Sequence, residues 1–316
     1  MSSSSPAVLV LATGGTIAGL APDPATSARY QPAQLGVRQL VDAVPALAGT
    51  ALQAEQVAQL DSKDMGPEVW SRLAARIAAA MADEAVAGIV ITHGTDTLEE
   101  TARLLSRLFG AGAKPVVLTA AMRPANAPQA DGPRNLADAV AVARALAVAG
   151  GGVVVVMQGR VWDAAQVRKL DTQALDAFGT AEAAPWGAVD DAGVVLGTRP
   201  LSVGPPLSLD PARLPAHDWP RVEIVSSHAG AEGRVVDLLV ADGVQGLVVA
   251  GTGNGTVHAQ LQAALQRAAA AGVAVVVGSR VGRGAVSGRH EGWPVAAEAT
   301  PAQVRVDLLL ALLARR

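Results

Sequence analysis

Two threonine-containing segments carry residue types that suit nucleophilic catalysis. One is TGGT at residues 13–16 and the other is HGTD at residues 93–96, and each directly follows a short apolar run. A threonine hydroxyl is a weak nucleophile until a base takes its proton. Lysine can act as that base when burial lowers its pKa, and a carboxylate can orient the base. Thr95, Lys169 and Asp96 could therefore act as hydroxyl, base and orienting group.

Each of these features has a simpler interpretation when taken alone. Residues 14–15 are two glycines, which favour a plain turn, and no lysine follows at the spacing of a phosphate-binding loop. His93 at the end of a strand can be structural, and Asp96 can cap a helix. Lys169 can be a solvated charge. The run GTGNG at 251–255 lacks the spacing and the following acidic residue of a dinucleotide site.

The elements that would position these residues alternate in type along the chain. Continuous apolar runs are typical of parallel strands covered on both faces. They lie at residues 7–12, 88–92, 115–119, 152–157, 221–227, 246–251 and 273–279. Ala- and Leu-rich segments with helix-start signals separate them, including a capping-box pattern at Thr97–Glu100 and a helix beginning at Thr256. The alternation predicts an α/β fold with mostly parallel sheets.

A proline-rich segment divides the chain into two parts of unequal size. Residues 197–220 contain six prolines and little periodicity, which indicates a linker. We therefore predict a larger N-terminal α/β domain over residues 1–196, carrying the threonines, and a smaller parallel α/β domain over residues 221–316. Both sizes suit single domains. Just before the linker, GAVDDAGVVLG has the pattern of a hairpin with its turn near Asp191.

The order of strands also predicts where a ligand would lie. In open α/β sheets, ligands bind beyond the carboxyl ends of the strands. Small and hydroxyl-bearing residues follow several predicted strands, at 13–16, 61–64, 92–97 and 120–124. They should converge on one small polar ligand. Tyr30, the only tyrosine, lies in a Pro- and Ser-containing loop of the kind that can close over a site.

Composition excludes several classes of function. The 316 residues carry a net charge of −3 and only 17% charged residues, which does not indicate nucleic-acid binding. The absence of cysteine excludes disulfides, thiol catalysis and thiolate metal sites, and the five histidines show no metal-ligand spacing. We expect no cofactor and no metal. No apolar run approaches the ~18 residues of a membrane span and no signal peptide is evident, so we expect a cytoplasmic protein without membrane contact.

Together, the motifs resemble one known family. The segments are TGGTIAG, YQPAQLGVRQLVDAVPAL, DSKDM, THGTDTLEETA, KPVVLTAAMRP, ADGPRNLADAV, VRKLDTQALDAF and GTGNG. They resemble the bacterial-type L-asparaginases and the related glutaminase-asparaginases, and the resemblance covers essentially the whole chain. It implies hydrolysis of L-asparagine to L-aspartate and ammonia through a threonine acyl-enzyme, with weaker action on L-glutamine.

The resemblance also implies roles for individual residues. Thr16 corresponds to the threonine that is acylated, Tyr30 to the loop tyrosine that assists it, and Thr95, Asp96 and Lys169 to the second catalytic group. An alternative in which Thr95 or water attacks first remains open. Substrate contacts are implied for Gly15, Ser62, Lys63, Gly94, Thr95, Asp96, Ala121 and Glu291. Ser62 would bind the α-carboxylate and Asp96 the α-ammonium group.

Family active sites are completed across a subunit interface, so the resemblance implies a homodimer or homotetramer. Glu291 would reach the neighbouring subunit's site. Three positions depart from the common pattern. Lys63 adds a charge beside Ser62 that either tightens carboxylate binding or points to solvent. Thr256 weakens the match at the intersubunit contact, and residues 158–160 replace a more usual Asn-Asp pair.

Two other functions would fit parts of the pattern. The amidase subunit of a glutamine-dependent transamidation complex has a similar core but usually an extra N-terminal domain, and the first predicted strand here starts near residue 7. A non-catalytic amino-acid-binding protein would leave both threonine motifs and Lys169 unexplained.

Overall fold

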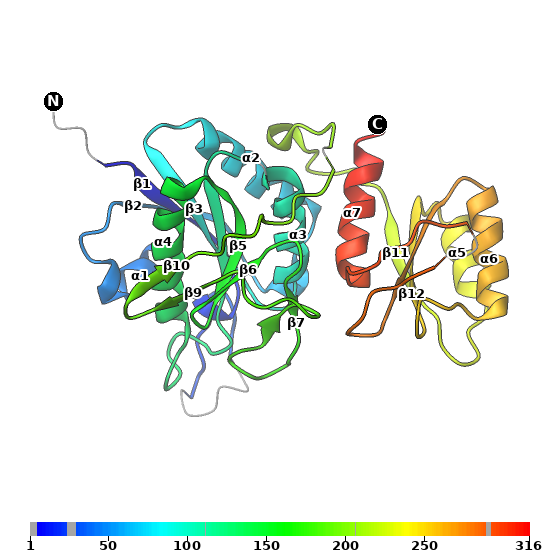
Figure 1. Ribbon diagram of the computed structural model, residues 1–316, viewed down its shortest axis with the longest axis horizontal. Helices are drawn as coiled ribbons and strands as arrows, with labels where there is room; N and C mark the ends of the chain where they lie inside the picture. Colours follow the sequence, from blue (N-terminus) through cyan, green and yellow to red (C-terminus); the bar gives the residue numbers. More distant parts are fainter. Residues whose placement is uncertain (1–4, 24–29, 111, 206, 289–291) are drawn as a thin grey trace. The chain divides into compact units, whose positions relative to one another are not determined.

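The structure, a computed structural model, describes residues 5–23, 30–110, 112–205, 207–288 and 292–316. The chain divides into two compact units (Figure 1). The first comprises the residues up to Thr180 together with Ala184–His217, and the second comprises Ala181–Ala183 and Asp218–Arg316. Most of the segment predicted as a linker is thus counted with the first unit. Within the described ranges, no helix has the length and apolar character needed to cross a bilayer.

The first unit is built on an eight-stranded mixed sheet with strand order β10-β9-β6-β5-β4-β3-β1-β2. Strands β1 to β5 pair in parallel, and β6, β9 and β10 extend the sheet in antiparallel pairs. Their bounds are Ala7–Gly14 (β1), Leu52–Leu60 (β2), Val86–Thr92 (β3), Pro115–Thr119 (β4), Gly152–Met157 (β5), Arg160–Asp163 (β6), Gly187–Asp190 (β9) and Gly193–Val195 (β10). The hairpin predicted near Asp191 is formed by β9 and β10.

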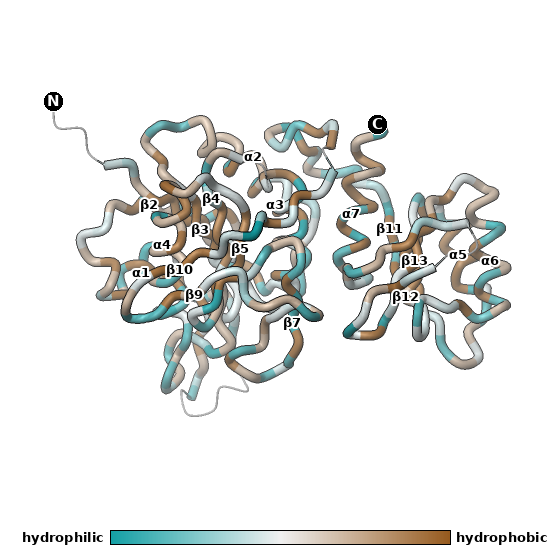
Figure 2. The backbone as a smooth tube through the Cα atoms, in the orientation of Figure 1, coloured by the Kyte–Doolittle hydropathy of each residue, from teal (hydrophilic) through white to brown (hydrophobic). Residues whose placement is uncertain are grey.

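Helices cover both faces of this sheet because its parallel strands are apolar on both sides. On one face, α1 and α4 pack on side chains such as Val8, Val10, Val90 and Val117. Helices α2 and α3 bury side chains such as Leu73 and Leu104, and α3 contacts β4 and β5. The helices are Val37–Asp42 (α1), Pro67–Ala82 (α2), Leu98–Phe109 (α3) and Gly132–Ala149 (α4). Figure 2 shows apolar residues along the central strands.

The direction of the sheet's winding reverses between β1 and β3. From β1 the chain first passes to β2 on one side, and then returns to add β3, β4 and β5 on the other side. The carboxyl ends of the two strands at such a reversal are the usual ligand-binding position in open α/β sheets. The two threonine segments follow β1 and β3, so they lie at this position.

The second unit is a smaller parallel α/β sheet. Its strands, in the order β11-β12-β13, are Val222–Ser226, Gly246–Gly251 and Ala274–Ser279, and both pairs are parallel. Helices Arg234–Ala241 (α5) and Ala259–Ala270 (α6) pack with side chains of the sheet to form an apolar core. Helix Pro301–Leu313 (α7) contacts all three strands. The predicted two-domain α/β fold is confirmed.

One predicted helix start is confirmed in position and another is wrong. Thr97 is the N-cap residue of α3, as predicted, but its hydroxyl donates to the backbone oxygen of Ser62 at 2.7 Å instead of to the first turn of the helix. Thr256 does not begin α6, because it pairs with Thr252 in a short backbone bridge. His258 is the N-cap of α6.

Candidate active site

The loops after β1 and β3 meet backbone to backbone through two glycines. Gly15 has a φ of +81°, and a Cβ atom there would lie 2.3 Å from the Cα of Gly94. A Cβ atom on Gly94 would in turn lie 2.5 Å from the Oγ of Ser62, in the loop after β2. A side chain at Gly15 would displace backbone, and one at Gly94 would displace the Ser62 side chain. These glycines therefore allow the loops carrying Thr16, Ser62 and Thr95 to reach the same place.

Thr16 forms the first hydroxyl pair of the site. It begins the one-turn 3₁₀ helix Thr16–Ala18, is 6% exposed, and its Oγ1 lies 2.6 Å from the Oη of Tyr30. The loop that carries Tyr30 is closed at its base by two backbone hydrogen bonds between Leu20 and Gln31. The structure thus brings together the threonine and the tyrosine that the sequence separates by fourteen positions.

The electrostatic surroundings of Tyr30 limit its chemistry. Burial raises the pKa of Tyr30 above its usual value, the hydrogen bond with Thr16 opposes this rise, and the carboxylates of Asp61 and Asp96 add to it. The phenol is therefore protonated at neutral pH. It can accept a proton from Thr16 only if it passes its own proton on, so it is suited to relaying a proton rather than to acting as a standing phenolate base.

Thr95, Lys169 and Asp96 form the second group. The Nζ of Lys169 donates to Thr95 Oγ1 at 3.0 Å and to Asp96 Oδ1 at 2.9 Å. Lys169 lies in the short strand β7 (Arg168–Lys169), which pairs with β8 (Phe178–Gly179). Its backbone N–H also donates to Glu99 Oε2 at 2.9 Å, which ties the strand to the first turn of α3. The hydroxyl, base and orienting group proposed from sequence are in direct contact.

Ser62 links the loop after β2 to this group. Its Oγ accepts the backbone N–H of Asp96 at 3.1 Å, and its side chain is almost fully buried. Its backbone oxygen accepts the Thr97 hydroxyl described above. These two bonds hold Ser62 and Asp96 side by side, as is needed if they bind neighbouring groups of one ligand.

The loop after β4 is fixed by side chains at the N-terminal end of α4, from its N-cap residue Asp131 and from Asn135. Asp131 accepts the backbone N–H groups of Met122 and Arg123, each at 2.9 Å. The amide of Asn135 donates to the backbone oxygen of Ala120 at 3.0 Å, and the adjacent Ala121 is fully buried. The small side chain of Ala121 packs beside Ile17, which directly follows Thr16.

Three residues singled out from the sequence have other surroundings. Lys63 is exposed, and its ammonium pairs with Asp64 at 2.6 Å and Asp61 at 3.3 Å rather than with the threonine groups. Thr13 donates to the backbone oxygen of Thr92 at 3.0 Å and so supports the β1–β3 pair. Glu291 lies outside the residues that the structure describes.

Sequence reasoning missed a buried hydrogen-bonded chain beneath the Thr95 loop. The Nε1 of Trp70 donates to Thr101 Oγ1 at 2.9 Å, and Thr101 Oγ1 lies 3.0 Å from His93 Nε2. The Nδ1 of His93 lies 2.7 Å from the backbone oxygen of Gly94. Trp70 and Thr101 occupy ordinary buried helix positions, so their pattern alone gave no sign of this contact. The sequence also gave no role to Glu99.

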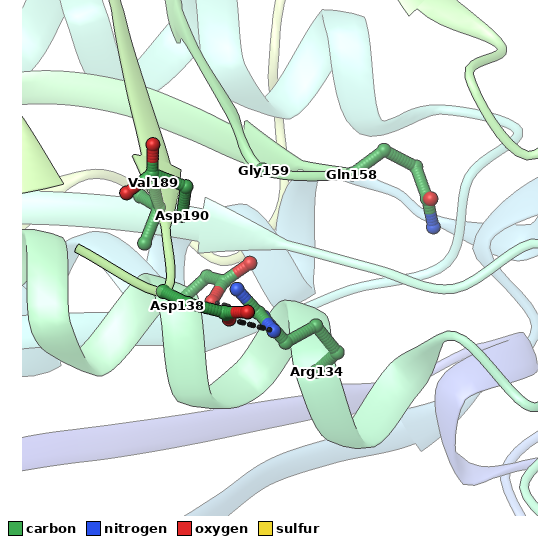
Figure 3. A pocket seen from close by; sticks show the side chains of 7 residues that line it. Arg134, Asp138, Gln158, Gly159, Val189 and Asp190 are labelled. Atoms are coloured by element: carbon green, nitrogen blue, oxygen red, sulfur yellow. Dashed lines mark hydrogen bonds and ion pairs between the residues drawn. The ribbon is translucent and has the colours of Figure 1, made fainter. Parts of the chain in front are cut away.

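A separate cavity of about 360 Å³ lies near the N-terminal half of α4 (Figure 3). Arg134 pairs there with Asp138 at 2.8 Å and with Asp191 at 3.2 Å. The other lining residues are Gln158, Gly159, Val189 and Asp190. None of the residues predicted to be catalytic lines this cavity. The threonine hydroxyls after β1 and β3 each contact a side chain that can transfer a proton, Tyr30 for Thr16 and Lys169 for Thr95. This arrangement, rather than the cavity, is what an α/β enzyme acting on a small polar substrate requires.

Comparison with known proteins places this enzyme in one family. A family model described as "Asparaginase, N-terminal" matches residues 7–201, and one described as "Glutaminase/Asparaginase C-terminal domain" matches residues 221–316. The chain belongs to the asparaginase family.

Individual relatives agree with this membership. A "Probable L-asparaginase periplasmic" of Haemophilus influenzae is 38% identical over 97% of this chain and 88% of its own length. A "Glutaminase-asparaginase" of Pseudomonas fluorescens is 35% identical over 96% of this chain and 86% of its own length. The crystal structure of a probable cytoplasmic L-asparaginase from Campylobacter jejuni matches with a TM-score of 0.88 and 34% identity, covering 98% of this chain and 95% of that one.

Proposed function

We propose that this chain is an L-asparaginase that hydrolyses the side-chain amide of L-asparagine to give L-aspartate and ammonia, with weaker action on L-glutamine. The observation that carries the proposal is the pair of threonine hydroxyls after β1 and β3, each within 3.0 Å of a group that can transfer a proton. Family membership and the names of the relatives support the substrate class.

In the first half-reaction, Thr16 Oγ1 attacks the amide carbon, and its proton passes to Tyr30. Tyr30 hands on a proton so that the nitrogen leaves as ammonia, which leaves an ester on Thr16. This assignment fits the raised pKa of Tyr30, because a protonated phenol can deliver one proton as it accepts another. Peptide mapping of the acyl adduct formed during turnover distinguishes this order from the alternative in which Thr95 or water attacks first.

In the second half-reaction, water held near Thr95 and Lys169 attacks the ester carbon and the bond from that carbon to Thr16 Oγ1 breaks. The proton that the water loses returns through Tyr30 to Thr16 Oγ1, which restores the hydroxyl. Asp96, at 2.9 Å from the Lys169 ammonium, orients it and is placed to bind the α-ammonium group of the substrate. Ser62, fixed beside Asp96, is placed to bind the α-carboxylate. Gly15, Gly94 and Ala121 line the pocket with small groups. Lys63 is paired with Asp61 and Asp64, so its contribution is limited to the electrostatic potential around the substrate's α-carboxylate.

The proposal includes a homodimer or homotetramer in which Glu291 reaches a neighbouring subunit's site, as the family resemblance implies. Its test is activity measured beside sedimentation velocity for the intact protein and Glu291→Ala. A fully active monomer contradicts this arrangement. A cytoplasmic location also belongs to the proposal, although relatives carry both "periplasmic" and "cytoplasmic" in their names.

The substrate assignment is tested by ammonia release from L-Asn, L-Gln and D-Asn, with Thr16→Ala as the matched control. One methylene in a pocket is worth about 1–3 kcal/mol, so we expect kcat/KM for L-Asn to exceed that for L-Gln by about 10–200-fold. Thr16→Ala should bind L-Asn without turnover. Binding of L-Asn without turnover in the unsubstituted protein would instead identify a non-catalytic amino-acid-binding protein.

A further inference from the structure

The buried chain Trp70–Thr101–His93 can be read in only one hydrogen-bonding direction. An indole N–H can only donate, so Thr101 Oγ1 accepts from Trp70. The single hydroxyl proton of Thr101 is then available to donate to His93 Nε2. At the other end, the backbone oxygen of Gly94 can only accept, so His93 Nδ1 carries the imidazole proton. The Gly94 end therefore fixes the Nδ1–H tautomer of a neutral imidazole, and the Thr101 hydroxyl has the one proton that Nε2 of this tautomer needs.

The surroundings make this chain rigid and costly to break. Trp70 is 3% exposed, and His93 and Thr101 are fully buried. Burial lowers the pKa of His93 to about 4, so the imidazole is neutral near pH 7. A buried polar group without a partner costs free energy, so a chain of this kind persists only when each member is satisfied. The polar side chains therefore hold one arrangement rather than filling space as apolar residues would.

The arrangement acts on the peptide that joins Gly94 to Thr95. The C=O and N–H groups of a trans peptide point in opposite directions. His93 holds the Gly94 oxygen at 2.7 Å, so the Thr95 N–H points away from the imidazole. Within the part of the chain that the structure describes, this N–H has no acceptor. The orientation of this peptide also fixes the position of the Thr95 Cα atom, and thus the direction in which the Thr95 side chain leaves the backbone. The hydroxyl of that side chain contacts Lys169.

We propose that His93 is a positioning residue for amide hydrolysis, locked as the Nδ1–H tautomer by Thr101 and Trp70 so that the Gly94–Thr95 peptide keeps its orientation. The inference rests on the proposed function of the site. It assigns to the histidine of the HGTD segment a role in alignment, without contact with the substrate. Loss of the lock should lower kcat more than it changes KM, because the binding groups Ser62 and Asp96 lie on other peptides.

A matched pair of variants separates alignment from packing. Thr101→Ser keeps the hydroxyl and loses a methyl group, whereas Thr101→Val keeps the shape and loses the hydroxyl. We expect Thr101→Ser to retain near-normal kcat. In Thr101→Val, kcat should fall by about tenfold to a hundredfold with KM little changed, as expected for a misaligned catalytic group.

The pair His93→Asn and His93→Gln gives a second comparison. Asn places its amide near the position of Nδ1 and can donate to the Gly94 oxygen, whereas Gln reaches toward Thr101. We expect kcat to be better retained in His93→Asn. If Thr101→Val lowers Tm but leaves kcat at the Thr101→Ser value, the chain is only structural and the proposal is overturned.

Nitrogen-15 NMR of the unsubstituted protein tests the tautomer without reference to activity. The chain has five histidines, so His93 can be assigned by its absence from the spectrum of His93→Asn. We expect a neutral Nδ1–H imidazole at pH 7, and an Nε2–H tautomer or an imidazolium would overturn the proposal. If the unsubstituted protein releases no ammonia from any amide, the proposed function fails, while the NMR result still decides the tautomer.

Discussion

The burial of a neutral His93 predicts a specific loss of stability in mild acid. In the unfolded chain a histidine titrates near 6.5, whereas burial lowers the pKa of His93 to about 4 in the folded state. Between these values the unfolded state binds more protons than the folded state, so the free energy of unfolding decreases as the pH falls. The contribution is complete above pH 6.5 and is lost progressively down to about pH 4.

The size of this effect follows from the two pKa values. At about 1.4 kcal/mol for each tenfold change in proton affinity, the gap between 6.5 and about 4 corresponds to about 3 kcal/mol. That is a large share of the ~5–15 kcal/mol typical of a folded domain. Because His93 is fully buried, solvent screening removes little of it.

The assay is urea unfolding monitored by circular dichroism, repeated from pH 7.5 to pH 4 at one protein concentration. His93→Gln is the reference, because it lacks the titrating group and keeps every other carboxylate and histidine. The difference between the two proteins in free energy of unfolding should be constant above pH 6.5. It should then change by about 3 kcal/mol toward pH 4, with the wild-type protein losing more. Parallel curves over the whole range would refute the assignment of a buried neutral imidazole, and a direct NMR titration of His93 gives the same answer if the variant folds poorly.

Three further substitutions test the site. Gly15→Ala puts a methyl group 2.3 Å from the opposing glycine backbone at a φ of +81°, so we expect both Tm and kcat/KM to fall; an unchanged Tm would contradict this close approach. Tyr30→Phe removes the hydroxyl 2.6 Å from Thr16, and kcat for ammonia release should fall about 10²–10⁴-fold with an unchanged circular dichroism spectrum. Normal kcat in this variant would exclude the tyrosine from proton transfer. Lys169→Met should slow the second half-reaction, so that rapid-quench kinetics show a burst of ammonia followed by slow turnover. The absence of a burst with unimpaired turnover would contradict the role given to this lysine.

The sequence predicted the strands and the loops that carry the site because both depend on local patterns. Continuous apolar runs mark β4, β5 and β12, and their observed bounds are the predicted ones. The position of Thr16 and Thr95 beyond neighbouring strands follows from the α/β alternation together with the rule that ligands bind at carboxyl strand ends.

Contacts between distant segments were not predictable in the same way. The hydroxyl of Thr97 matches a capping pattern, yet it bonds Ser62 from another loop, 35 positions earlier. Trp70 and Thr101 read as ordinary helix residues, and only the packing of α2 against α3 brings them together with His93. Such hydrogen bonds depend on tertiary placement, which local sequence patterns do not encode.

In the proposed reaction, Thr16 carries the acyl group. The most direct measurement is mass spectrometry of the protein quenched during turnover of L-Asn, with peptide mapping of the adduct in the unsubstituted protein, Thr16→Ala and Thr95→Ala. We predict an aspartyl ester on the peptide containing Thr16, its accumulation in Thr95→Ala, and no adduct in Thr16→Ala. An adduct that persists in Thr16→Ala, or one that maps to Thr95, would show that Thr16 is not the acylated residue.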